Sequence, residues 1–208
     1  RADIELLLAG AGFEPTAVRP HGSQMVNVTV ARLRTIPDIV GPSMRVLMCG
    51  LNPSLYAADQ GVNFARPGNR LWPAALAAGL VTRDRDPFDA LETHGVGWTD
   101  LVKRATVGAA EIGGDEYRVG VTRLRRVVEW LAPRVVCFIG LAGWRAAIDR
   151  RATAGVQPDG FAGAAAYLMP NTSGLNARSQ HTDFVDHLTA VAAMAGPERS
   201  YGGCVRPH

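Results

Sequence analysis

The chain has 208 residues, of which 47% are hydrophobic and 20% are charged, with a formal net charge of +3. This length allows one globular domain with a well-buried core and excludes two large ones, while the modest positive charge suits a polyanionic partner without proving one. No segment reaches the roughly 18 to 20 consecutive apolar residues of a membrane span, and acidic residues interrupt the first apolar run, so we expect a soluble, cytoplasmic protein without membrane contact.

The two ends of the chain differ in composition from its centre. Glycines and prolines interrupt every periodic stretch up to about residue 40, so we interpret residues 1–40 as an N-terminal extension and assign it no chemistry. Residues 196–208 have the composition of a loose tail. The globular domain is therefore expected at residues 41–195.

Strands and helices alternate through this central region. Short apolar runs predict strands at 44–50, 134–140 and 164–169, and residues 95–102 are expected to form a strand end or a loop. Apolar residues at helical spacing predict helices over 70–80, 88–94, 117–131 and 181–194. The alternation implies an α/β protein with a largely parallel central sheet covered on both faces, in which ligands bind at the carboxyl ends of the strands.

The cysteines and histidines indicate neither a disulfide framework nor a metal site. The three cysteines are odd in number, and Cys49 and Cys137 lie in apolar runs where an inert free thiol is usual; the third is Cys204. No two cysteines have CxxC spacing and the five histidines are scattered, so zinc and iron–sulfur clusters lack ligands. We expect no metal and no other cofactor.

Two polar loops follow predicted strands at the same edge of the expected sheet. The first is Gly50-Leu-Asn-Pro-Ser54 and the second is Pro170-Asn-Thr-Ser-Gly-Leu175. Each carries a side-chain amide beside a proline or glycine that fixes the backbone, which aims hydrogen bonds at a ligand rather than at the core. Taken singly, either loop is also compatible with an ordinary turn.

Together with two intervening segments, these loops form a more specific pattern. The pattern resembles the mismatch-specific uracil-DNA glycosylase and thymine-DNA glycosylase family, in order and spacing, over roughly residues 36 to 195. Its four motifs are Gly50-Leu-Asn-Pro53, Gly61-Val-Asn-Phe-Ala-Arg-Pro-Gly-Asn-Arg-Leu-Trp72, Gly97-Trp-Thr-Asp-Leu-Val102 and Met169-Pro-Asn-Thr-Ser-Gly-Leu175. The resemblance implies a three-layer α/β/α fold of the uracil-DNA glycosylase type.

The same resemblance implies a DNA-repair enzyme. Such an enzyme hydrolyses the N-glycosidic bond of a flipped-out uracil, or of thymine or another damaged pyrimidine, mispaired with guanine, and it leaves an abasic site. Its partner is double-stranded DNA with a G:U or G:T mismatch, and we expect a monomer. The nucleotide must leave the helix because a stacked base presents its glycosidic carbon to no enzyme.

The resemblance assigns roles to three residues of the first two motifs and to Ala57, which lies between them. Asn52 matches the asparagine that positions the attacking water, since an amide oxygen can accept from water at a fixed angle. Phe64 matches the aromatic ring that stacks on the extruded pyrimidine, and Leu51 the residue whose backbone faces that base. Ala57 stands where bacterial mismatch enzymes have serine and animal thymine enzymes have alanine, which leaves space for a 5-methyl group.

The last motif is expected to contact DNA. Asn171 matches the amide near the sugar and phosphate, and Ser173 belongs to the same DNA-binding set. Gly174, Leu175 and Asn176 match the wedge that enters the helix where the base has left, and an apolar plug there would hold the gap. Arginines that flank the motif loops are candidate phosphate contacts: Arg66, Arg70 and Arg178.

Two positions depart from the family pattern. Asp100 stands where better-known relatives have lysine or asparagine, and its carboxylate is a candidate general base, with a loop aspartate bonded to its own backbone as an equal alternative. Ser54 replaces a glycine and restricts the first loop. Asp59 and His181 are weaker candidates for the role of the base.

Other residues receive structural interpretations, and two other functions stay open. The tryptophans of predicted helices, Trp72, Trp130 and Trp144, are interpreted as core or half-buried anchors. The pair Arg125-Arg126, within Arg123 to Arg126, is interpreted as a solvated helix face, with a phosphate-tracking role as the alternative. A non-catalytic binder of mismatched or distorted DNA is one alternative, which Asn52 beside Phe64 disfavours. An α/β enzyme acting on free nucleosides is another, which the Leu175 wedge disfavours because a free nucleoside has no stack to refill.

Overall fold

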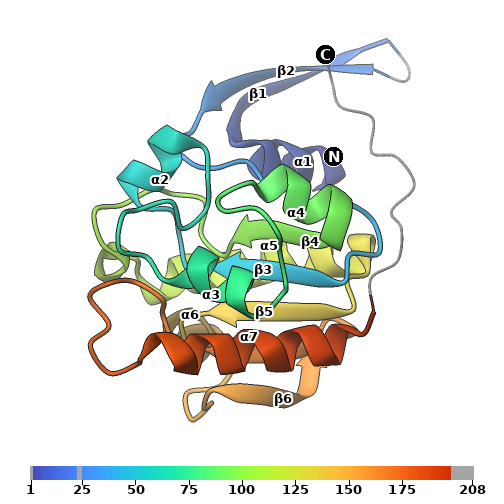
Figure 1. Ribbon diagram of the computed structural model, residues 1–208. Helices are drawn as coiled ribbons and strands as arrows, with labels where there is room; N and C mark the ends of the chain where they lie inside the picture. The colour runs from blue at the N-terminus through green and yellow to red at the C-terminus, as the bar shows by residue number, and fades with distance from the viewer. Residues whose placement is uncertain (1, 23–24, 198–208) are drawn as a thin grey trace.

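A computed structural model of the chain describes residues 2–22 and 25–197. Its centre is a sheet of five strands in the order β4-β3-β5-β7-β6 (Figure 1). The first four strands of that order are mutually parallel, and β6 pairs antiparallel with β7 at the edge. The strands are β3 (Val46–Gly50), β4 (Val96–Asp100), β5 (Val135–Ile139), β6 (Gly155–Phe161) and β7 (Ala164–Met169). The predicted, largely parallel sheet is thus confirmed.

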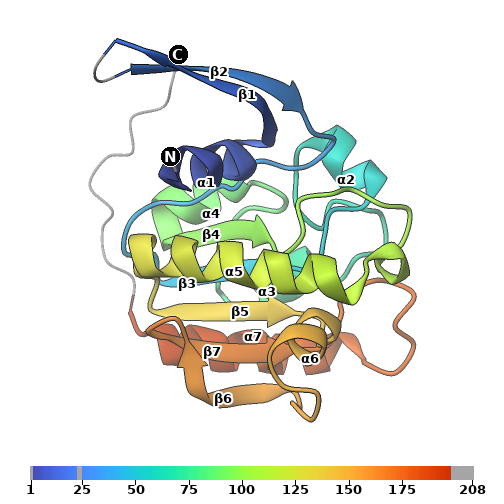
Figure 2. The ribbon, with the colours of Figure 1, turned by 180° about the vertical axis from the view of Figure 1, so that it is seen from behind.

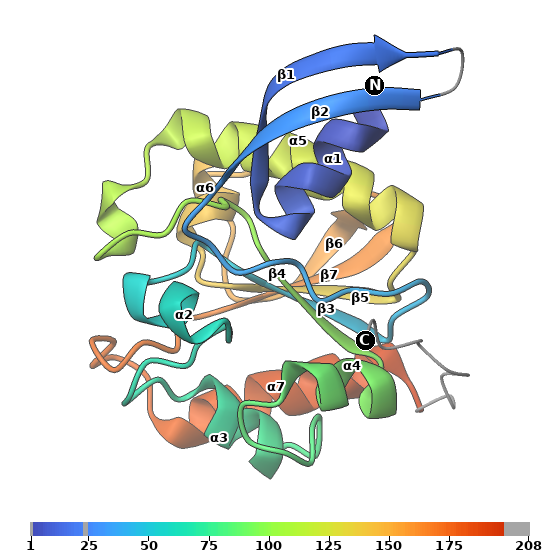
Figure 3. The ribbon, with the colours of Figure 1, turned by 90° about the horizontal axis from the view of Figure 1, so that it is seen from above.

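Helices cover both faces of this sheet and make three layers, as the view from above shows (Figure 3). One face carries α3 (Leu71–Ala77), α4 (Pro87–His94) and α7 (His181–Ala195). The other carries α1 (Ala2–Ala11), α5 (Gly114–Leu131) and α6 (Ala142–Ala147). The short helix α2 (Leu55–Gln60) follows β3, and a 3₁₀ turn, η1 (Ala109–Glu111), follows β4. None of the helices in the described residues is long and apolar enough to span a membrane.

The core is formed between the sheet and the two helical layers. All five residues of β3, of β4 and of β5 are buried, because central parallel strands are covered on both faces. Trp72 of α3 stacks on Trp98 of β4 with ring centroids 4.4 Å apart, and Trp144 is buried against Phe138, whereas Trp130 is 62% exposed. The anchor interpretation therefore holds for two of the three helical tryptophans and is wrong for Trp130.

The N-terminal residues form regular elements that the sequence did not predict. Helix α1 precedes an antiparallel hairpin of β1 (Phe13–His21) and β2 (Met25–Arg32), which lies beyond α1 on the outside of the domain (Figures 1 and 2). Pro15 is tolerated because the register of this two-stranded edge shifts between Pro15 and Ala17. The glycines and prolines that interrupt the periodic stretches therefore do not prevent regular structure in this extension.

The segment after the hairpin joins the core directly. Ile36 and Ile39 are buried, and Ile39 exchanges backbone hydrogen bonds of 2.9 and 2.8 Å with Trp98 of β4. The division of the chain at residue 41 stays a prediction. The buried Cys49 and Cys137 are free thiols, whereas Cys204 and most of the expected tail lie outside the described residues.

Candidate active site

A pocket of about 350 Å³ opens at the carboxyl ends of the parallel strands. Both polar loops line it, as expected, and so does the loop after β4, which the sequence did not single out. In Figure 1 these loops gather to the left of the sheet. The lining residues are Leu51, Asn52, Pro53, Ser54, Phe64, Arg66, Asn69, Thr106, Val107, Gly108, Ala109, Ile139, Asn171, Ser173, Leu175 and Asn176.

The amide of Asn52 is held in one orientation. Its Nδ2 donates to the carbonyl oxygens of Pro53 at 3.1 Å and Arg104 at 3.0 Å, and to Thr106 Oγ1 at 2.7 Å. Because a carbonyl can only accept, these contacts identify the nitrogen and leave Oδ1 on the other side of the amide. Oδ1 accepts no hydrogen bond from residues 2–22 or 25–197, so it is available to a ligand or to water at the pocket.

The loop after β4 locks the loop that carries Asn52. Thr106 donates its backbone N–H to Pro53 O and accepts from Leu55 N, both at 3.1 Å. Its hydroxyl donates to Gly108 O at 2.9 Å, so it accepts from Asn52 rather than donating to it. A single threonine among alanine, valine and glycine carries no sequence signal for this role. The pairing appears only when two residues 54 positions apart in the sequence are brought together.

Phe64 lines the pocket and is held in place by a strained backbone conformation and by aromatic neighbours. Its φ of 58° lies in the left-handed region, which a bulky residue adopts only when its surroundings impose it. The ring lies 6.4 Å from Trp98, and Trp72 Nε1 donates to the preceding Asn63 O at 2.7 Å. Phe64 and Leu51 both line the pocket, so the structure brings two of the predicted base-binding residues together.

Ala57 does not join them. It is buried in α2, and it is not among the residues that line the pocket. The departure at Ser54 has a local explanation: its Oγ accepts from Ala57 N at 3.1 Å and caps the start of α2, as serine commonly does. A role for Ala57 in accommodating a methyl group stays a prediction.

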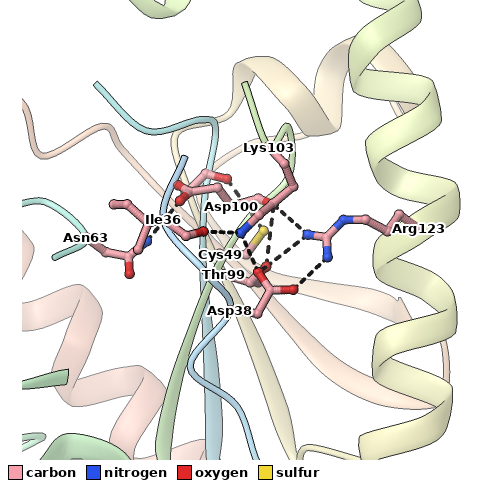
Figure 4. Close-up of polar contacts among 9 residues, drawn as sticks. Ile36, Asp38, Cys49, Asn63, Thr99, Asp100, Lys103 and Arg123 are labelled. Carbon is pink, nitrogen blue, oxygen red and sulfur yellow. Dashed lines mark hydrogen bonds and ion pairs between the residues drawn. The ribbon is translucent and has the colours of Figure 1, made fainter. Parts of the chain in front are cut away.

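Asp100 ends β4 directly behind the pocket wall. It is 3% exposed, and Asn63 Nδ2 donates to its Oδ2 at 2.9 Å (Figure 4). A Cβ on Gly50 would lie 2.3 Å from Asp100 Oδ1 and 3.1 Å from the Phe64 ring, so only glycine lets the carboxylate and the ring converge there. Asp100 therefore lies behind Gly50 and Phe64, and it is not one of the lining residues.

Burial sets the basicity of this carboxylate. Burial raises the pKa of Asp100 to about 6 and the nearby Asp38 adds to the rise, whereas Lys103 and Arg123 oppose it. An aspartate in this state is mostly ionised at neutral pH and is a stronger base than an exposed one. This property is compatible with the predicted general base.

Beneath Asp100, two cations share a carboxylate from the N-terminal segment. Asp38 accepts from Lys103 Nζ and Arg123 Nη1, both at 2.7 Å, and from Thr99 Oγ1 at 2.6 Å (Figure 4). Burial disfavours the charged form of Asp38, but the two cations outweigh it and hold the pKa of that carboxyl below its usual value. Arg123 also donates to Asp100 O at 2.7 Å. Arg123 therefore faces the sheet, whereas Arg125 of the same helix is exposed, as predicted for the pair Arg125-Arg126.

Arg70 anchors the second polar loop instead of facing solvent. Its guanidinium donates to the carbonyl oxygens of Ser173 at 3.0 Å, Asn176 at 2.6 Å and Ser179 at 2.7 Å, and it lies over the Phe184 ring at 4.7 Å. All these bonds are internal, so the interpretation of Arg70 as a phosphate contact is wrong. Backbone carbonyls are invisible to sequence patterns, which explains the error.

The anchored loop presents Leu175 outward. Leu175 is 85% exposed at the pocket, and the preceding Gly174 has no room for a side chain because a Cβ would lie 3.0 Å from Gly68 O. Asn171 Oδ1 accepts from Ser173 N at 2.9 Å, and Asn176 Nδ2 donates to Asn171 O at 2.7 Å. The amides of this loop thus stabilise its own turn.

The remaining candidates divide by position. Arg66 lines the pocket and Arg178 is exposed on the Leu175 loop, so both are placed to meet a phosphate. Asp59 forms an exposed, two-bonded pair with Arg34 at 2.6 and 2.9 Å, and His181 is exposed at the start of α7. Neither of the last two lines the pocket. Among the described residues, no group of three or more histidine, cysteine or acidic side chains is arranged to hold a metal ion.

A family model described as the uracil DNA glycosylase superfamily matches residues 37–193. The matched region covers more than half of the chain and contains every residue that lines the pocket. It also contains Asp38, Lys103 and Arg123 of the buried charge cluster.

Proposed function

The chain belongs to the uracil DNA glycosylase superfamily, whose members bind DNA and hydrolyse N-glycosidic bonds, and we propose that this protein excises uracil mispaired with guanine and leaves an abasic site. The proposal includes thymine or another damaged pyrimidine opposite guanine as further substrates. We also propose that the protein acts on double-stranded DNA as a monomer in the cytoplasm.

The single observation that supports this proposal most strongly is the fixed amide of Asn52. Three acceptors hold its nitrogen, and its oxygen is left to accept from a water at the pocket. A water held at a fixed angle is prepared to attack the sugar carbon without an entropic penalty at the moment of reaction. A protein that only binds distorted DNA has no need for such an arrangement.

The neighbouring side chains suit a base rotated out of the helix. Stacking of the base on Phe64 is worth roughly 1 to 3 kcal/mol and tolerates different bases. Extrusion costs a few kcal/mol and is cheapest at a mismatch, and an apolar side chain such as Leu175 offsets that cost by filling the gap. We infer that Leu175 is the plug and that Arg66 and Arg178 contact the phosphates.

We assign Asp100 the role of general base in this scheme. Cleavage makes the sugar positive and the departing pyrimidine negative, and the attacking water must lose a proton. With a pKa of about 6, Asp100 is ionised at neutral pH and can accept that proton. The carboxylate lies directly behind Gly50 and the Phe64 ring, and Gly50 begins the loop that carries Asn52.

The test is a single-turnover assay on an end-labelled duplex with one G:U pair, followed by hot alkali to break abasic sites. A matched duplex with a normal C:G pair is the control. We expect strand breakage only at the uracil, together with release of free uracil. Tight binding of the mismatch without breakage would show a non-catalytic binder, and release from free deoxyuridine alone would show a nucleoside enzyme.

A further inference from the structure

A second exposed apolar side chain lies at the mouth of the pocket. Val107 is 71% exposed and lines the pocket, as does Leu175, which is 85% exposed. Val107 belongs to the loop after β4 and Leu175 to the loop after β7, and the sheet order places β3 and β5 between them. At about 4.8 Å per strand interval, the two loops start roughly 14 Å apart on opposite sides of the opening.

The loop that carries Val107 is held as firmly as the loop that carries Leu175. On one side of Val107, Thr106 is bonded to the Asn52 loop. On the other side, Gly108 N donates to Glu111 Oε1 at 2.9 Å, and Glu111 O in turn accepts from Arg104 Nη2 at 3.2 Å. A mobile loop would let a valine turn inward, but these bonds hold it outward at the opening.

We propose that Val107 packs on a deoxyribose of the strand that carries the extruded nucleotide, as a second apolar contact across the pocket from Leu175. This inference rests on the proposed function. A nucleotide that enters the pocket draws its own strand over the mouth, and the sugar ring is the apolar part of that strand which a short side chain can meet. The segment around Val107 is uncharged from Ala105 to Ala110, so it suits a sugar better than a phosphate.

The spacing limits which sugar is contacted. Roughly 14 Å corresponds to about four base steps of 3.4 Å in B-form DNA. The contacted deoxyribose therefore lies within about four nucleotides of the extruded one. The contact should hold the strand in its bent path, so it strengthens binding of substrate and of abasic product alike.

The experiment measures binding by fluorescence anisotropy to a duplex with a tetrahydrofuran abasic analogue opposite guanine. Val107→Ala removes two methyl groups and should weaken binding about 15-fold, which corresponds to about 1.6 kcal/mol at roughly 0.8 kcal/mol for each buried group. Val107→Thr keeps the shape but replaces a methyl with a hydroxyl, and it should weaken binding as well. The matched control is Val119→Ala, because Val119 is also 71% exposed but lies on α5 and does not line this pocket.

The sugar is identified with propanediol spacers, which keep the phosphate but lack the deoxyribose ring. One spacer is placed in turn at each of about four positions on either side of the analogue. A spacer at one position should weaken DNA binding by the wild type and should have no further effect on DNA binding by Val107→Ala. The proposal is overturned if Val107→Ala binds as tightly as the wild type. It is also overturned if the losses of affinity caused by the spacer and by the substitution add at every spacer position. A wild type that neither binds nor cleaves any mismatch duplex overturns the proposed function instead.

Discussion

Replacing Thr106 with valine tests how the amide of Asn52 is oriented. Thr106 is 3% exposed, and valine has almost the same shape, so Thr106→Val removes the hydroxyl without opening a cavity. Two hydrogen bonds are lost, from Asn52 Nδ2 at 2.7 Å and to Gly108 O at 2.9 Å. The amide keeps its bonds to Pro53 O and Arg104 O, so its orientation is loosened and not abolished.

The magnitude follows from these bonds. Each ordinary hydrogen bond contributes about 0.5 to 1.5 kcal/mol, so the variant, which loses two, should lose about 1 to 3 kcal/mol of folding free energy. The single-turnover rate of excision should fall about tenfold, which corresponds to about 1.4 kcal/mol in activation free energy. This loss is smaller than the 2 to 4 kcal/mol, roughly, expected for deleting a preorganised catalytic group outright.

The assay compares Thr106→Val with Thr106→Ser, which keeps the hydroxyl and should recover most of the rate. Affinity for an abasic-analogue duplex should fall less than the rate in the valine variant, because the backbone bonds of Thr106 to Pro53 and Leu55 still hold the loop that carries Val107. Equal impairment of the serine and valine variants, or a wild-type rate in the valine variant, would refute the argument that Thr106 positions Asn52.

Three further predictions concern the pocket itself. Asn52→Ala should keep the fold and duplex binding but lose roughly 2 to 4 kcal/mol of activation free energy, so a wild-type single-turnover rate would remove it from the mechanism. Leu175→Ala should slow cleavage more at a well-paired U:A target than at G:U, and an equal effect on both would contradict the plug. Asp100 has a pKa of about 6, so activity should decline as pH falls through 6 and protonates the base. Asp100→Asn should remove that acidic limb and slow cleavage roughly 10² to 10⁴-fold, whereas a structural aspartate predicts lower thermal stability at an unchanged rate and pH profile.

The sequence predicted the central architecture because the responsible signals are local. The apolar runs that became β3, β5 and β7 and the apolar stripe of α5 each depend on neighbouring residues, and their positions agree with the structure. Strand β4 was uncertain because Gly97 and a terminal aspartate weaken its apolar run. Strand β6 was missed because its exposed edge carries polar residues, glycine and proline.

The candidate site was only partly predictable, because sequence signals are local whereas much of the site depends on contacts between distant loops. Asn52, Phe64 and Leu175 belong to motifs and are at the pocket, as expected. Thr106 and Val107 have no motif, and their importance depends on the loop after β4 meeting the loop after β3. Ion pairs between residues far apart in the sequence are equally hard to predict. Asp38 pairs with Lys103, 65 residues further along the chain, and with Arg123, 85 residues further along.

The groups that hold the site together are separate from the groups that face the ligand. Internal backbone and side-chain partners take the hydrogen bonds of Arg70, Thr106 and the nitrogen of Asn52. The groups left to face a ligand include the amide oxygen of Asn52 and the exposed side chains of Val107 and Leu175, and Arg66 also lines the pocket. A preorganised site needs this division, because a group that changes partners when DNA binds must first be reoriented. The loops therefore gain their rigidity from polar contacts, and we propose that DNA meets chiefly the apolar tips that those contacts hold in place.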